Sequence, residues 1–205
     1  MIKVALTGNV ASGKSTVAGI WSETGIPVIR ADDLAREVVA AGSGGLATVV
    51  EEFGEDVLRE DGTLDRIRLR NRIFRDSGAR VRLERILHPL IGRLRDDWVA
   101  HQEEQGISLV VAEIPLLYEA GLERDYDIVV LVVAPREERL RRLREDRGFD
   151  DEEASRMMAA QIPTAEKLPK ADFVLENGGP REELEIRSLA LLDLLRARAR
   201  RSQDR

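Results

Sequence analysis

Short, almost continuously apolar segments recur along the chain, separated by longer segments in which apolar residues have helical spacing. These runs predict strands at residues 2–6, 28–29, 108–112, 127–133 and 172–175. The run from Ile128 to Val133 has no polar alternate position, which is typical of a parallel strand covered on both faces. The alternation predicts an α/β fold, a three-layer, doubly wound parallel sheet of five strands that binds ligands at the strands' carboxyl ends.

One long stretch, residues 35–105, has helical spacing and little strand character. It predicts a helical subdomain inserted between the second and third strands. Gly42 to Gly45 and Asp61-Gly62 are its expected turns, and Pro89 is expected to kink or end the helix that contains His88. The segment from Pro180 to about Arg201 predicts a single amphipathic helix.

The segment from Gly8 to Ser15 is a complete phosphate-binding loop, with a strand-like run before it and a helix-like segment, 15–24, after it. In such a loop the backbone N–H groups surround a phosphate, the lysine reaches the β- and γ-phosphates, and the serine hydroxyl binds Mg²⁺. Lys14 and Ser15 take these places, so the ligand is expected to be ATP with Mg²⁺. The expected nucleotide ligands in this segment are Gly8, Asn9, Val10, Ala11, Ser12, Gly13, Lys14, Ser15 and Thr16.

Composition narrows the class of protein further. The chain has 205 residues and no cysteine, so a disulfide scaffold, a thiolate zinc site and a cysteine nucleophile are excluded. A formal net charge of −6 argues against nucleic acid as a partner. No apolar run reaches the roughly 20 residues that cross a bilayer. We expect a cytoplasmic protein with no membrane partner, either a monomer or a weak homo-oligomer.

Acidic residues near the strand ends distinguish a kinase from a switch or a motor. The chain has no Asn-Lys-x-Asp segment for reading guanine, and the strand at 109–112 ends in a single acid, Glu113. Asp32 or Asp33, just after the second strand, could accept a proton from an acceptor hydroxyl during phosphate transfer. Either could instead cap the helix that starts at Leu34, and the two interpretations are compatible.

An arginine-rich segment, 136–147, follows the fourth strand. Most of its residues fit a solvated helix with i, i+4 ion pairs. In a phosphate-loop kinase the lid descends here, and its arginines neutralise charge on the transferring phosphoryl group. Arg139 and Arg142 share a helical face, so we expect this pair to point inward.

Motifs over nearly the whole chain resemble the dephospho-coenzyme A kinase family. The specific ones are Leu87-His88-Pro89-Leu90-Ile91 and Ile114-Pro115-Leu116-Leu117-Tyr118-Glu119, at this spacing from the loop. Gly25-Ile26-Pro27-Val28-Ile29, Ala160-Gln161, Lys167 and Asn177-Gly178-Gly179 continue the likeness. The resemblance implies a phosphate-loop kinase fold with a helical substrate-binding insertion and a helical lid.

The same resemblance implies transfer of the ATP γ-phosphate to the ribose 3′-hydroxyl of dephospho-coenzyme A. Asp32 matches the family's proposed base, while Asp33 is outside the motif. Arg142 falls at the lid arginine, so the implied catalytic residues are Asp32, Lys14 and Arg142. Asn177, Gly178 and Gly179 would lie near the adenine, and the acceptor side would be shaped by Thr7, Asp32, His88, Pro115, Leu116 and Glu119.

Some positions depart from the family's pattern. Arg30 stands where an acid is common, and Asn9 or Ala11 where a glycine is common. The lid reads Asp146-Arg147 where an Arg-Asp pair is usual, so neither residue is given a catalytic role. Glu113 replaces an aspartate, which leaves open whether it reaches the metal through water or only orders the loop.

The predicted organisation is one domain over 1–205. Its core comprises residues 1–34, 106–135 and 170–205, its helical insertion about 35–105 and its lid about 136–169. Two alternatives remain at this point, another phosphate-loop kinase such as a nucleoside monophosphate kinase, and a nucleotide-dependent regulatory switch.

Overall fold

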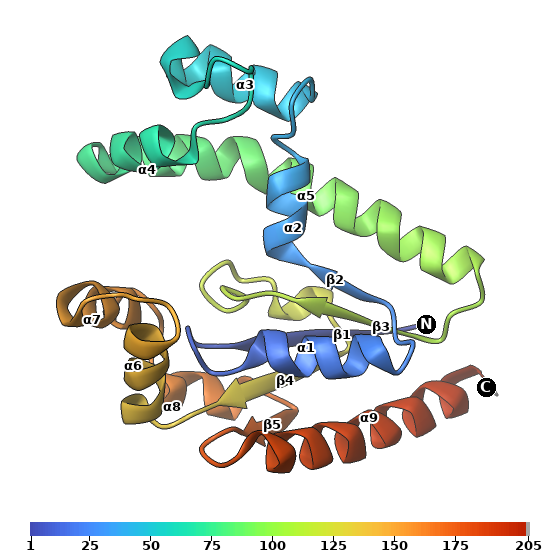
Figure 1. Ribbon diagram of the computed structural model, residues 1–205. Coiled ribbons are helices and arrows are strands. Elements are labelled where there is room, and N and C mark those ends of the chain that lie inside the picture. The colour runs from blue at the N-terminus through green and yellow to red at the C-terminus, as the bar shows by residue number, and fades with distance from the viewer. Residues whose placement is uncertain (204–205) are drawn as a thin grey trace. The chain divides into compact units, whose positions relative to one another are not determined.

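Strands and helices alternate along the chain (Figure 1). The computed structural model describes residues 1–203, without the side chains at 74, 75, 77, 202 and 203. The strands are β1 (Ile2–Gly8), β2 (Val28–Arg30), β3 (Leu109–Glu113), β4 (Ile128–Val133) and β5 (Phe173–Glu176). The helices are α1 (Lys14–Glu23), α2 (Ala31–Glu37), α3 (Gly44–Phe53), α4 (Arg66–Arg75), α5 (Ser77–Glu104), α6 (Arg136–Glu145), α7 (Asp151–Ala159), α8 (Thr164–Lys167) and α9 (Arg181–Gln203), with short 3-10 turns η1 (Glu55–Val57), η2 (Glu123–Asp125) and η3 (Leu168–Lys170).

The strands form one parallel sheet in the order β2-β3-β1-β4-β5, which confirms the predicted fold. The central strand β1 aligns Leu6 with Glu113 of β3 and Gly8 with Val132 of β4. Because all strands run the same way, their carboxyl ends share one edge of the sheet. The phosphate-binding loop leaves β1 at that edge.

The main core lies between the sheet and the helices α1 and α9, which pack together on one face (Figure 1). Trp21 of α1 is fully buried there and donates its indole N–H to the Ser188 carbonyl of α9 at 2.9 Å. Residues facing the other side of the strands, such as Ala5, Val110 and Val129, are buried as well. Burial on both faces explains why these strands are apolar throughout.

The chain divides into two compact units, with the boundary near Arg30 and inside α5. The sheet unit comprises Met1–Arg30 and the chain from Gln102 onward, and the helical unit is Ala31–His101. The helical unit has its own core, which includes Val49, Phe53 and Leu69. Its helices begin at predictable caps, since Ser43 caps α3 and the Asp65 carboxylate accepts from two N–H groups of α4.

Two local expectations in the helical unit need correction. Helix α5 continues through Pro89 to Glu104, so of the two alternatives for this proline, a kink or an end of the helix, the end is wrong. A proline removes one backbone N–H, and the apolar face of α5 that packs into the unit's core outweighs that loss. Gly44 and Gly45 belong to α3 rather than to the predicted turn, and a side chain at Gly45 would meet the Val38 carbonyl 2.2 Å away.

Trp21→Phe is expected to lower the free energy of unfolding by about 2–3 kcal/mol, because it leaves a gap and removes a donor from a buried carbonyl. Urea denaturation followed by circular dichroism measures this. The half-buried Trp98 provides the matched control, since Trp98→Phe should cost less than about 1 kcal/mol. Equal losses of unfolding free energy in the two variants would contradict the central position of Trp21 in the core.

Candidate functional site

The phosphate-binding loop joins β1 to α1 and requires glycine at two points. A Cβ on Gly8 would lie 2.3 Å from the Val132 carbonyl oxygen, and Gly13 adopts φ 98° at the start of α1. No side chain caps α1 at Gly13. The first N–H groups of the helix therefore face the loop, where an anion can accept their hydrogen bonds.

Ala11 holds the left-handed backbone conformation with φ 58°, which costs a non-glycine residue about 1 kcal/mol. Contacts from other elements hold this part of the loop in place. The Asn177 side chain donates to the Ser12 carbonyl at 2.7 Å, and Arg142 donates to the Ala11 carbonyl at 3.2 Å. The strained conformation is tolerated because the carbonyls of Ala11 and Ser12 both accept hydrogen bonds from other elements.

Ser15, Glu113 and Arg30 form a chain of polar contacts at the strand ends. The Ser15 hydroxyl donates to Glu113 Oε1 at 2.7 Å, and Arg30 Nε lies 3.2 Å from Glu113 Oε2. Glu113 is buried, whereas the Arg30 side chain is 43% exposed. Arg30 and Glu113 are register partners in β2 and β3, so the pairing follows from the sheet.

The donors at this point suit Mg²⁺. In the part of the chain that the structure describes, no group of three or more acidic, histidine or cysteine side chains could cage a metal ion. A hydroxyl and one carboxylate are nevertheless what Mg²⁺ takes from a protein when phosphates and waters supply the rest. Ser15 and Glu113 would hold it, beside Lys14, whose Nζ lies 3.3 Å from the Asn9 carbonyl.

Arg142 lies at the opposite end of the loop, against Asn177. Its Nη2 donates to the Asn177 carbonyl at 3.1 Å, and its Nε pairs with Glu138 at 3.0 Å. Hydrogen bonds from Arg141, together with the charge of Arg142, hold the pKa of Glu138 at about 2, so this anchor stays ionised. Beside them is a cavity of about 620 Å³, lined by Ala11, Gly13, Thr16, Arg142, Asn177 and Gly179 among others. We call it the nucleotide cavity, after the ligand that the sequence predicts at this loop.

Residues 161–167 are tied to the loop from the other side. The Val10 N–H donates to the Gln161 side chain at 2.7 Å, and Asn9 donates to the Ile162 carbonyl at 3.2 Å. Glu119 accepts from the Ile162 N–H at 3.0 Å and from Lys167 Nζ at 2.8 Å. The loop, the 114–119 segment and residues 161–167 therefore form one hydrogen-bonded assembly.

The Glu119–Lys167 pair is the buried charge pair of this assembly. Lys167 has no exposed surface, and the Glu119 side chain is 18% exposed. Burial raises the pKa of the Glu119 carboxyl, but the hydrogen bonds from Lys167 and from backbone N–H groups outweigh it and leave the pKa below its usual range. Glu119 consequently acts as a fixed anion that positions residues 162–167.

Thr7 is expected to help shape the acceptor side, and that role stays a prediction. It is fully buried and donates its hydroxyl to the Ile114 carbonyl at 2.7 Å. It therefore positions the segment that begins at Ile114. In that segment Pro115 is half-buried and Leu116 is exposed, so these two present surface to a ligand.

Asp32 and His88 belong to the helical unit. Asp32 lies in the first turn of α2 and is exposed, and among residues 1–203 its carboxylate caps no N–H group of that helix. The neighbouring Asp33 pairs with Arg36 at 3.1 Å. His88 is exposed on α5, whereas Leu87 and Leu90 pack against the core of the unit.

Three functional contacts escaped sequence analysis. Arg30 joins Glu113, Gln161 fixes Val10, and Lys167 neutralises Glu119. Gln161 and Lys167 stand in motifs of the resemblance, which gave them no role. Their contacts span 151 and 48 residues, so no local pattern reveals them.

Comparison with known proteins agrees with these motifs. A family model described as dephospho-CoA kinase matches residues 2–183. A dephospho-CoA kinase of Anaeromyxobacter dehalogenans is 45% identical over 199 residues, covering 97% of this chain and 94% of the relative. A crystal structure of a Thermus thermophilus protein aligns with TM-score 0.82 and 38% identity over 95% of this chain and 97% of that one. A Campylobacter jejuni dephospho-CoA kinase aligns with TM-score 0.72 and 25% identity over 94% and 96%.

Glu119→Gln is expected to lower the free energy of unfolding by about 3 kcal/mol, because it leaves the Lys167 ammonium buried without a counter-charge. The double variant Glu119→Gln/Lys167→Met should recover at least half of the loss, which denaturant titration of the two variants measures. Since the folded-state pKa of Glu119 is depressed, the wild-type advantage is complete at neutral pH and disappears as the pH falls through that pKa. A double variant less stable than Glu119→Gln would contradict this account.

Proposed function

The chain belongs to the dephospho-CoA kinase family, and from that premise we propose how its own residues carry out the reaction. The activity is ATP-dependent phosphorylation of dephospho-CoA, a step of coenzyme A biosynthesis. The proposal concerns the ribose 3′-hydroxyl as acceptor, the metal and the role of each site residue. The observation that carries it is the Ser15–Glu113 hydrogen bond beside the phosphate-binding loop.

Donor binding is assigned to the loop. Its backbone N–H groups at the start of α1 bind the phosphates, and Lys14 places its ammonium near the β- and γ-phosphates. Ser15 and Glu113 would hold Mg²⁺, which would neutralise charge on the phosphate oxygens. Arg30 keeps the Glu113 carboxylate turned toward Ser15, as the 3.2 Å ion pair supports.

Arg142 is assigned to the base end of the nucleotide. Its guanidinium hydrogen-bonds the carbonyls of Ala11 and Asn177, so it braces the wall of the nucleotide cavity between them. Gly178 and Gly179 follow, and a side chain at Gly178 would lie 3.1 Å from the Pro135 ring. These contacts support a role in shaping the adenine end, in addition to the role at the transferring phosphate that the lid position implies.

Asp32 is assigned as the base. It would accept the proton of the acceptor hydroxyl as the oxygen attacks the γ-phosphorus and ADP leaves in line. Two observations support the choice. Asp33 forms an ion pair with Arg36, whereas among residues 1–203 Asp32 has no such partner. Asp32 also lies two residues after Arg30, which ends its strand and meets Glu113. His88, Pro115 and Leu116 offer exposed or half-exposed surface to the acceptor.

ADP release with dephospho-CoA as acceptor tests the proposed function. We expect turnover that depends on Mg²⁺ and on this acceptor, with little or none for a panel of nucleoside monophosphates. Faster turnover of a monophosphate would favour the nucleoside monophosphate kinase alternative. ATP hydrolysis that no small acceptor accelerates would favour a regulatory switch.

Asp32→Asn is expected to lower kcat by roughly 10²- to 10⁴-fold, the range of a general base, with ATP affinity unchanged. Steady-state kinetics and nucleotide titration measure the two effects. Asp33→Asn is the matched control, because it removes the same charge one residue away and only breaks a surface ion pair. A loss of kcat of tenfold or less in Asp32→Asn would contradict the assignment of Asp32 as the base. Asp32 would then be only a residue of the first turn of α2.

A further inference from the structure

A second cavity, of about 560 Å³, lies beyond the other side of the loop, between α6, α7 and residues 161–164. We call it the lid cavity. The residues that carry its chemistry are Asn9, Arg136, Arg139, Ser155 and Thr164, and its described lining contains no carboxylate. A hollow with two guanidinium groups and no acid favours an anionic ligand.

Arg139 is the unusual group in this cavity. It is only 8% exposed, and its Nε and Nη1 atoms are buried with no hydrogen-bond partner among residues 1–203. Burial, followed by repulsion from Arg136, lowers the pKa of Arg139. A buried cation without a counter-ion is costly, so the site favours whatever supplies negative charge to it.

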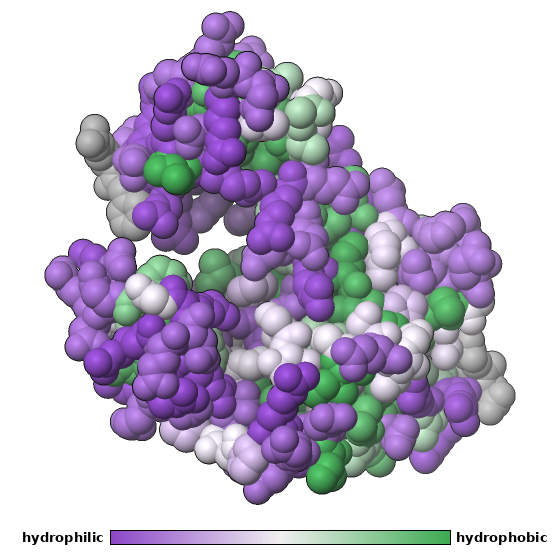
Figure 2. Space-filling view, in the orientation of Figure 1, coloured by the Kyte–Doolittle hydropathy of each residue, from purple (hydrophilic) through white to green (hydrophobic). Residues whose placement is uncertain are grey.

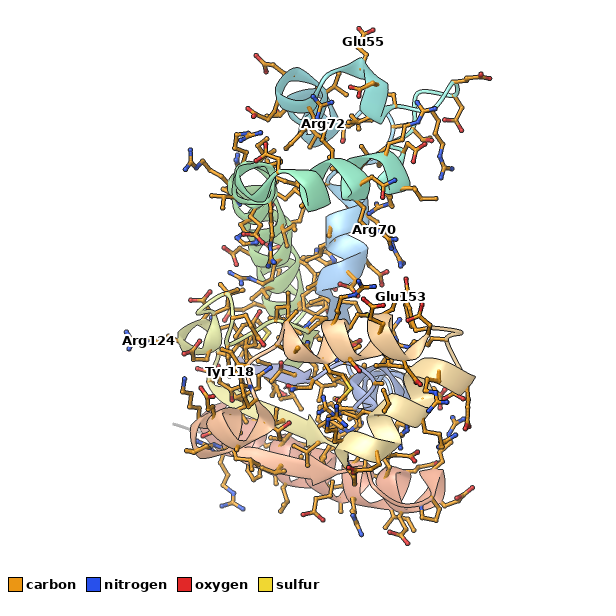
Figure 3. All side chains as sticks on the ribbon, turned by 90° about the vertical axis from the view of Figure 1, so that its left-hand side faces the viewer. Glu55, Arg70, Arg72, Tyr118, Arg124 and Glu153 are labelled. Atoms are coloured by element: carbon orange, nitrogen blue, oxygen red, sulfur yellow. The ribbon has the colours of Figure 1, made fainter. Side chains whose placement is uncertain are left out.

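Four of the six acids on α6 and α7 pair with arginines that do not line the lid cavity, and the exposed Glu137 does not line it either. On α6, Glu138 pairs with Arg141 and Arg142, and Glu145 pairs with Arg141. On α7, Asp151 pairs with Arg144 and Glu152 with Arg156, while Glu153 points away from α6 (Figure 3). The surface over α6 and α7 is correspondingly hydrophilic (Figure 2). None of these carboxylates lines the lid cavity.

Asn9 adds a second requirement that a ligand in the lid cavity has to meet. Its amide nitrogen donates to the Ile162 carbonyl at 3.2 Å, which directs Oδ1 the other way, and within residues 1–203 that buried oxygen has no donor. A ligand at Arg139 and Asn9 therefore needs acceptor oxygens for the guanidinium and one hydroxyl for the amide oxygen. Monohydrogen phosphate has both, as does a singly protonated phosphate monoester.

We propose that the lid cavity is a binding site for a phosphate-type anion, held by Arg139 with Arg136 and Asn9, and separate from the nucleotide cavity. The two cavities share no lining residue. They lie on different faces of α6, with Arg136 and Arg139 on one and Glu138, Arg141 and Arg142 on the other. Arg139 and Arg142 are both largely buried, which agrees with the inward direction that their spacing predicts, but they line different cavities. The site does not depend on dephospho-CoA being the acceptor.

Calorimetric titration of inorganic phosphate into the full chain, saturated with Mg²⁺ and a non-hydrolysable ATP analogue, tests the proposal. The occupied loop cannot then take up phosphate itself. We expect one phosphate to bind, and Arg139→Gln to weaken it at least tenfold while Arg139→Lys weakens it less. Arg144→Gln is the matched control, since Arg144 is on the same helix, lines neither cavity and pairs with Asp151 at the surface.

A second set of titrations, without nucleotide and with ATP or ADP, identifies where the phosphate comes from. If phosphate binds only without nucleotide, and Arg139→Gln weakens ATP at least tenfold more than ADP, the anion is the nucleotide's terminal phosphate, and the proposal of a separate site is overturned. Circular dichroism checks that wild type and Arg139→Gln are both folded. If the two proteins have the same phosphate affinity and the same ratio of ATP affinity to ADP affinity, the proposal is overturned and Arg139 pairs with Asn9 instead. Turnover of dephospho-CoA, measured separately, distinguishes this failure from a failure of the proposed function.

Discussion

The parallel pairing of β1 with both of its neighbours is the constraint on which the site depends. Its register sets Leu6 opposite Glu113 and Gly8 opposite Val132, so the loop leaves the sheet directly beside the acid of β3. A slip of one residue would turn every side chain of a strand to the opposite face. Burial on both faces prevents such a slip, and Gly8 is needed because the Val132 carbonyl leaves no room for a Cβ.

The loop is held by polar contacts that come from distant parts of the chain. Asn177 and Arg142 bond one side of it, and Gln161 bonds the other through Val10. Glu119 and Lys167 then hold the segment that carries Gln161. Because low-dielectric surroundings make an unpaired member of such a network costly, each contact restricts the others. This gives the loop a defined shape, including the unfavourable backbone angle at Ala11.

Sequence reasoning recovered what is local. Apolar runs located five strands, and the loop motif located the turn from β1 to α1, because both depend on neighbouring residues. Of its two alternatives for Pro89, a kink or an end of the helix, the end was wrong, because the apolar face of α5 continues past the proline. It missed the partners of Glu113 and Glu119, since a carboxylate in a strand end or a loop does not reveal which distant cation will meet it. It assigned Thr7 to the acceptor side from a motif, which shows that a residue matters without showing that its hydroxyl donates to the Ile114 carbonyl.

Helix α6 illustrates why net charge is a poor guide to a local site. The chain carries a formal charge of −6, yet α6 presents two different electrostatic faces. On one face, Glu138 lies between Arg141 and Arg142, and the charges cancel within one helical turn. On the other, Arg139 is buried, and among residues 1–203 no carboxylate pairs with it or lines the lid cavity beside it. Burying a cation is costly unless a counter-charge offsets it, and the anion that we propose for the lid cavity would supply that charge.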